Sequence, residues 1–141
     1  MKSDEKTLQR VFAIKWAGLY PMYVNKVERK GHTTDELDQV IRWLTGYTAA
    51  GLKKQLASDN DLTAFFDQAP KMNPNRLLVT GVICGVRVEE IEHPLMREIR
   101  ILDKLVDELA NGRAMEKILR EPADGAAAAA ARPKRVAKKP A

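Results

Sequence analysis

The hydrophobic pattern of the chain is clearest between Pro94 and Asn111. Apolar residues recur there at steps of four, three, four and three, which places them on one face of an α-helix. These residues are Leu95, Ile99, Leu102, Val106 and Leu109. Pro94 suits the first turn, where its missing N–H has no partner, and Gly112 can adopt the left-handed conformation that ends a helix. The pattern predicts a long helix over 94–111 at the centre of the core.

Capping residues and glycines predict shorter helices before the long one. Thr33 and Glu36 have the spacing of a capping box, and Gly46 would end the helix that they begin. Thr48 can cap the next helix, and the polar cluster 58–61 can cap a short one after it. A last helix is predicted over 114–120.

The first thirty residues are harder to interpret. Between Ser3 and Trp16 the apolar positions fit either a helix capped by Ser3 or an extended segment, and we prefer the helix. Apolar residues of 19–27 then form a helical stripe, in which Pro21 is tolerable because it falls in the first turn. Gly31 would end this second helix.

The segment 76–92 allows two interpretations. Its β-branched residues could form a strand, but Gly81 and Gly85 interrupt it, and no second strand of similar quality exists to pair with it. We therefore predict a helix that ends at Cys84, with Gly85 as its stop, and a short second helix over 88–92. Cys84 has apolar neighbours and is expected to be a buried, unreactive thiol.

These elements predict an all-α fold in a single domain. A chain of 141 residues that is 45% hydrophobic can form one core. We expect about six or seven short helices, built around the long helix near 94–111, within a helical domain at 1–120. Residues 121–141 contain little besides Ala, Pro and Lys/Arg, cannot bury apolar surface, and are predicted to be a disordered basic tail.

The tail carries most of the net positive charge. Its five basic residues face only Glu121 and Asp124, which accounts for +3 of the net charge of +5. The basic residues are Arg132, Lys134, Arg135, Lys138 and Lys139. Cations of this kind neutralise phosphates whatever the base sequence, so we expect these residues to attract nucleic acid non-specifically. The alternative is that the tail is a solvated extension without a role.

Several motifs resemble those of a known family. They include 19–24 (LYPMYV), 41–47 (IRWLTGY), 81–91 (GVICGVRVEEI) and 94–109. Shorter matches are Phe65-Phe66, Ala69-Pro70 and Asn73-Pro74. In this order they resemble a bacterial family catalogued as domain of unknown function 2200, over residues 10 to 120. The resemblance implies a domain boundary, but it implies no catalytic residues because the family has no assigned activity.

The chain shows no recognisable catalytic or metal motif. One cysteine and two distant histidines, His32 and His93, are too few for a zinc site, and no phosphate-binding glycine loop or nucleophile motif is present. Carboxylates at Asp103, Asp107 and Glu108 are expected on a solvated face of the long helix, where they would pair with nearby cations. We expect no cofactor and no metal, and a non-enzymatic protein, with an enzyme of unrecognised type as the weaker alternative.

One set of aromatic residues could form a binding pocket. Tyr20, Tyr23, Trp43 and Tyr47 recur at helical spacing. Large aromatic residues at such positions usually pack in the core, and a pocket also needs polar groups that converge on it. Both interpretations stay open at this stage.

The predicted function is that of a small binding protein. No apolar run approaches 18 residues and the first residues lack the order of a secretory signal, so we expect a cytoplasmic protein with no membrane partner. The leading hypothesis is sequence-independent association with nucleic acid through the tail. The alternative is a protein-interaction or regulatory module that binds a protein partner or itself, with the tail incidental.

Overall fold

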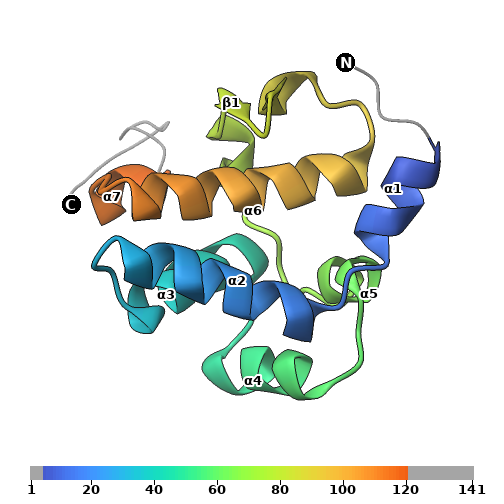
Figure 1. The fold of residues 1–141 in the computed structure, drawn as a ribbon, viewed down its shortest axis with the longest axis horizontal. Helices are drawn as coiled ribbons and strands as arrows, with labels where there is room; N and C mark the ends of the chain where they lie inside the picture. The colour runs from blue at the N-terminus through green and yellow to red at the C-terminus, as the bar shows by residue number, and fades with distance from the viewer. Residues whose placement is uncertain (1–4, 121–141) are drawn as a thin grey trace.

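The computed structural model describes residues 5–120, and this part of the chain contains seven α-helices, two short 3₁₀ helices and one two-stranded hairpin (Figure 1). The α-helices are α1 (Glu5–Phe12), α2 (Trp16–Arg29), α3 (Thr34–Thr45), α4 (Ala49–Ala57), α5 (Leu62–Asp67), α6 (Pro94–Ala110) and α7 (Met115–Ile118). The remaining elements are η1 (Pro74–Leu78), β1 (Val82–Ile83), β2 (Val86–Arg87) and η2 (Val88–Glu90). The predicted all-α class is confirmed. The predicted cap Ser3 and the tail 121–141 lie outside the described residues.

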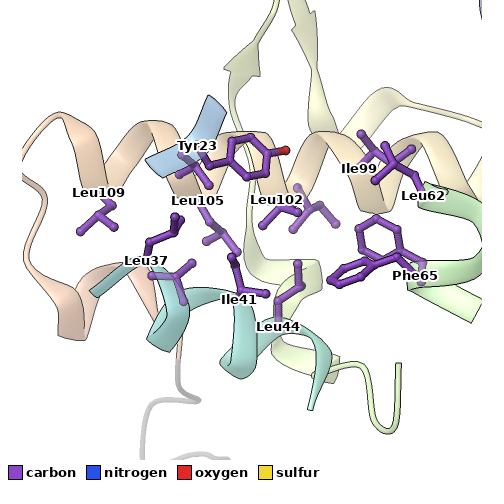
Figure 2. Packing of buried hydrophobic residues seen from close by; sticks show 14 of the residues in the cluster. Tyr23, Leu37, Ile41, Leu44, Leu62, Phe65, Ile99, Leu102, Leu105 and Leu109 are labelled. Carbon is purple, nitrogen blue, oxygen red and sulfur yellow. The ribbon is translucent and has the colours of Figure 1, made fainter. Parts of the chain in front are cut away.

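The long helix α6 lies at the centre of the fold, as predicted. Helices α2 and α3 pack along it, and α1, α5 and α7 contact it as well. Leu37 and Ile41 of α3 face Leu105 of α6 in the core (Figure 2), and all three are fully buried. The helix begins at Pro94, and the Nδ1 atom of His93 accepts a hydrogen bond from the N–H of Leu95. Its apolar stripe therefore organises the core that the other helices cover.

The predicted caps are confirmed at the start of three helices and at the end of one. Thr33 accepts a hydrogen bond from the N–H of Glu36 at 3.1 Å, and the Glu36 carboxylate accepts one from the N–H of Thr33 at 3.0 Å. The latter bond lowers the pKa of Glu36 below 4.5. Thr48 caps α4 and Asp61 caps α5 through their side-chain oxygens. Gly46 ends α3 with a φ of +80°.

The N-terminal helix is shorter than predicted. It ends at Phe12, and Trp16 begins α2 instead of ending α1. The break is stabilised by tertiary hydrogen bonds, because the N–H of Trp16 donates to Asn60 and the N–H of Leu62 donates to the carbonyl of Ile14. Pro21 consequently lies inside α2 and not in its first turn, and it is tolerated on the exposed side of the helix.

Trp16 forms the aromatic centre of the core. Its indole ring is fully buried and stacks on Phe65 of α5, with ring centroids 3.9 Å apart and planes inclined by 13°. Two tyrosines pack around this pair. The ring centroid of Tyr23 lies 6.3 Å from that of Trp16, and the ring centroid of Tyr47 lies 5.1 Å from that of Phe65. The stacked pair joins the start of α2 to α5.

The helix predicted over 76–84 is wrong, whereas the short helix predicted over 88–92 is present as the 3₁₀ helix η2 (Val88–Glu90). Val82 pairs with Arg87 and Ile83 with Val86 in an antiparallel hairpin, and the 3₁₀ helix η2 follows it. The two strands are only two residues long and pair with each other, so no distant partner strand is needed. Cys84 forms the turn with Gly85 and is exposed, which also contradicts the prediction of a buried thiol.

Candidate binding groove

An open groove of about 1150 Å³ lies between α3 and α4 and extends to α2 and to the end of α7. Its lining is mostly apolar. The larger apolar and aromatic residues in it are Tyr20, Trp43, Tyr47, Leu52, Leu56 and Leu119. Charged residues of both signs also line it: Asp35, Asp38, Arg42 and Lys53. This combination of apolar surface and a few polar groups is typical of binding sites.

Three of the four aromatic residues considered as a pocket from the sequence line this groove. Tyr20 comes from α2, Trp43 from α3, and Tyr47 from the corner between α3 and α4. Tyr23 lies instead in the core with 6% of its surface exposed, and its ring is directed toward α6 (Figure 2). Three of the four aromatic residues therefore line the groove, and the fourth, Tyr23, belongs to the core.

Hydrogen bonds fix the two tyrosines of the groove. The hydroxyl of Tyr20 donates to Asp38 at 2.5 Å, and burial together with this carboxylate raises the pKa of Tyr20 above its usual 10.0. The hydroxyl of Tyr47 donates to the carbonyl of Phe65 at 2.6 Å, and burial raises its pKa to about 12. Both phenols are therefore neutral hydrogen-bond donors that hold their rings in place.

The shape of the groove depends on the tight corner at Gly46. A Cβ atom at this position would lie 2.7 Å from the carbonyl oxygen of Lys71, so only glycine fits this corner. The Arg42 guanidinium reaches across the same corner and donates to the carbonyl of Tyr47 at 3.3 Å. The next helix then begins with Ala49 and Ala50, whose small side chains line the groove without filling it.

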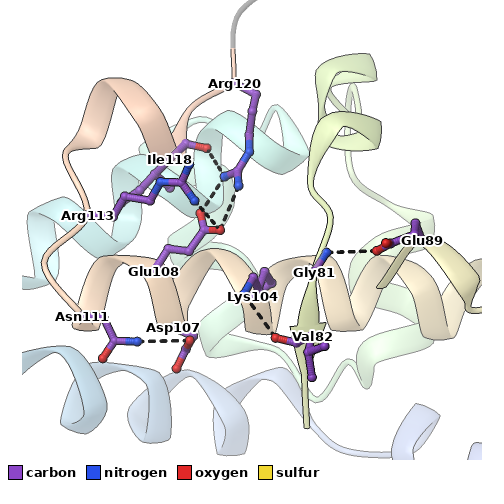
Figure 3. A network of polar contacts seen from close by, with 10 residues as sticks. All are labelled: Gly81, Val82, Glu89, Lys104, Asp107, Glu108, Asn111, Arg113, Ile118 and Arg120. Atoms are coloured by element: carbon purple, nitrogen blue, oxygen red, sulfur yellow. Dashed lines mark hydrogen bonds and ion pairs between the residues drawn. The ribbon is translucent and has the colours of Figure 1, made fainter. Parts of the chain in front are cut away.

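Beside the groove, a buried ion cluster holds the end of the described chain. The carboxylate of Glu108 accepts hydrogen bonds from Arg120 at 2.6 and 2.8 Å and from Arg113 at 3.0 Å (Figure 3). Glu108 is buried, so the expectation of a solvated position is wrong for this residue. Leu119, which lines the groove, directly precedes Arg120.

Of the other residues considered from the sequence, the carboxylates of α6 form ion pairs. The five basic residues of the tail lie outside the described residues. Asp107 is paired with Lys26 of α2 at 3.2 Å, and Asp103 is paired with Arg100 at 2.8 Å. Within residues 5–120, no group of three or more His, Cys, Asp or Glu residues could hold a metal ion. No helix in this part of the chain is long and apolar enough to cross a membrane.

The polar side of the groove was not predicted from the sequence. Asp35, Asp38, Gln39 and Arg42 lie at i, i+3, i+4 and i+7 on α3, which is the spacing of one helix face. The signal was therefore present, but a polar helix face normally indicates contact with solvent. No sequence pattern predicted Leu119 as a groove residue, because it reaches the groove only through the tertiary placement of α7.

Comparison with known proteins gives the family of this chain. A family model described as "Uncharacterized protein conserved in bacteria (DUF2200)" matches residues 10–120. The chain belongs to this family. The crystal structure of a protein described as uncharacterized protein SP1917 is similar to it, with 47% sequence identity and a TM-score of 0.75, and the match covers 79% of this chain and 91% of that one. No curated protein matches the chain.

The C-terminal limit of the DUF2200 match agrees with the packing of the fold. The match ends at Arg120, whose guanidinium is bound to the buried carboxylate of Glu108. It includes all of the groove-lining residues, from Tyr20 to Leu119. The family resemblance inferred from the sequence motifs is therefore confirmed.

Proposed function

We propose that this protein is a non-enzymatic binding module whose groove holds a short apolar segment of a protein partner. The observation that carries the proposal is the open groove of about 1150 Å³, which joins a mostly apolar lining to charged residues of both signs. Apolar contacts would supply most of the affinity, and the charged groups would set the direction of the bound segment.

The partner expected from this lining is a segment of small or medium apolar residues with charged residues on both sides. Asp35 and Asp38 would attract a cation, and Lys53 would attract an acidic residue. Trp43 supports a protein ligand as well, because a partly buried indole ring offers a large contact area at little cost in side-chain entropy.

A peptide library tests the proposal. Peptides displayed on phage would be selected on the full chain, and the enriched sequences would be synthesised and titrated by fluorescence anisotropy. Ala50→Trp should abolish binding because it fills the groove from an exposed position on α4. Ala57→Trp is the matched control, since it adds the same side chain to the same helix at an exposed position outside the lining. Equal binding to both variants, or no enrichment, would exclude the groove as the binding site.

The charge of the tail favours a second candidate function, sequence-independent association with nucleic acid. Residues 121–141 carry five cations against two carboxylates. A labelled DNA duplex and an RNA would be titrated at two salt concentrations with the full chain and with a chain whose five tail cations are changed to glutamine. Binding through all five cations predicts a log–log salt slope of at most about −4.5, which the neutralised chain would lose. The absence of binding to the full chain would remove this candidate.

A further inference from the structure

The tail begins beside the groove. Leu119 is one of the lining residues, and the ion cluster at Glu108 holds Arg120 one position later (Figure 3). The side chain of Arg120 is 14% exposed, and it also donates to the carbonyl of Ile118 at 2.9 Å. The described part of the chain therefore ends at a fixed point, one Cα–Cα step beyond a residue that lines the groove.

The alanine run of the tail is joined to the edge of the groove by a short stretch of chain. Ala126 follows Arg120 by six residues, which can span about 20 Å when fully extended. A segment joined to its site by so few residues has an effective concentration on the order of millimolar. A site with only millimolar affinity for the free segment would thus be about half occupied by the tethered one.

The chemistry of the tail also matches the groove. The run from Ala126 to Ala131 is the longest apolar run of residues 121–141 and follows Arg120 by six residues in the sequence, and its small side chains suit an open groove lined by Trp43 and Leu56. Acidic residues precede the run and Arg132 follows it. The groove also presents both signs of charge, with two carboxylates and two cations in its lining.

We propose that residues 126–131 occupy the groove of their own chain and that a partner segment must displace them. This inference rests on the proposed function of the groove as a binding site. Docking would shield Trp43 and would lower the apparent affinity for any partner peptide. The tail would then regulate the groove by competing for it.

The test uses the full chain with substitutions confined to the tail. Ala128→Glu combined with Ala129→Glu places two charges in the run, and Ala123→Glu combined with Ala137→Glu adds the same charge outside it. Acrylamide quenching of tryptophan fluorescence is the readout, because Trp16 is fully buried and Trp43 lines the groove. We expect faster quenching in the first variant only. Equal quenching in both variants and the unmodified chain would overturn the proposal.

The same variants separate this inference from the proposed function. The peptides selected above should bind the Ala128→Glu, Ala129→Glu variant about two- to tenfold more tightly than the unmodified chain, because the competitor is removed. Equal peptide affinity would refute tail docking and leave the groove as a binding site. Shielding of Trp43 without binding of any peptide would refute the partner site alone. Shielding that increases with protein concentration would assign the occupant to a second copy and overturn docking within one chain.

Discussion

The hydroxyl of Tyr23 donates a 2.5 Å hydrogen bond to the carboxylate of Asp103, which lies 80 residues further along the chain. The same carboxylate accepts a hydrogen bond from Arg100 at 2.8 Å. Burial and the charge of Asp103 raise the pKa of Tyr23 well above 10.0. The contact joins α2 to α6 at the edge of the core. It gives a structural role to two residues that the sequence placed in a pocket and on a solvated face.

Tyr23→Phe should destabilise the fold by about 1–3 kcal/mol, because it removes a hydrogen bond to a charged and largely buried acceptor. Urea denaturation of the variant and the unmodified chain measures this difference. Tyr20→Phe is the matched control, since Tyr20 makes an equally short bond to Asp38 from a more exposed position. If Tyr23→Phe lowers the free energy of unfolding no more than Tyr20→Phe does, burial does not strengthen the hydrogen bond between Tyr23 and Asp103.

The three tyrosines should titrate abnormally in the folded protein. Burial raises the pKa of Tyr47 to about 12, and burial together with a neighbouring carboxylate raises the pKa of Tyr20 and of Tyr23 above the usual 10.0. The folded chain therefore keeps phenol protons that the unfolded chain releases, so stability is unaffected below about pH 9 and falls as the pH rises past about 10. Phenolate absorbance should show a midpoint near 10 in urea and a higher one in buffer. A normal midpoint in buffer would refute the prediction.

Glu108→Gln should cost about 2–4 kcal/mol of folding free energy, because it leaves the largely buried guanidinium of Arg120, whose side chain is 14% exposed, without a counter-charge. Thermal or urea denaturation provides the measurement. Arg113→Gln tests the exposed partner of the same carboxylate, whose side chain is 45% exposed, and should cost less than about 1 kcal/mol. Equal losses would mean that the cluster acts as a surface ion pair.

Gly46→Ala should be more harmful than Gly31→Ala. Both glycines have a positive φ, which costs an alanine roughly 1–2 kcal/mol. Only at Gly46 would the new methyl group also meet backbone atoms, those of Lys71 at 2.7 and 2.8 Å, whereas nothing lies within 4 Å at Gly31. We expect a total loss of about 2–4 kcal/mol for Gly46→Ala, measured by urea denaturation. If Gly46→Ala and Gly31→Ala lower the free energy of unfolding equally, the backbone at Lys71 must move to make room for the methyl group.

Cys84→Asn should stabilise the hairpin by up to about 1 kcal/mol, because Asn adopts a positive φ more readily than Cys. Cys84 has a φ of +53° and is followed by Gly85 at +79°, as a tight hairpin turn requires. Denaturation in urea measures the gain.

The thiol of the unmodified chain should also react with a disulfide reagent without unfolding, since it is exposed. A protected thiol would contradict the hairpin placement.

Local signals explain the elements that were predicted well. The stripe of α6 and the capping box of Thr33 and Glu36 depend on spacings within one helix, so they can be read directly from the sequence. The aromatic set also contained three residues of the groove: Tyr20 on α2, Trp43 on α3 and Tyr47 at the corner that follows α3. The polar side of the groove was not predicted, since its residues look the same as a solvated helix face.

The sequence by itself determined the helical class and the central helix, because periodicity and caps act over a few residues. Its family motifs also marked the end of the matched region at Arg120. Tertiary structure decided the features that depend on distant partners. It paired the backbone of Trp16 with Asn60, separating α1 from α2, and it buried Glu108 among arginines that the sequence leaves unassigned. It also divided Tyr20 from Tyr23, because Tyr23 is buried and bound to Asp103 of α6, whereas Tyr20 lines the groove.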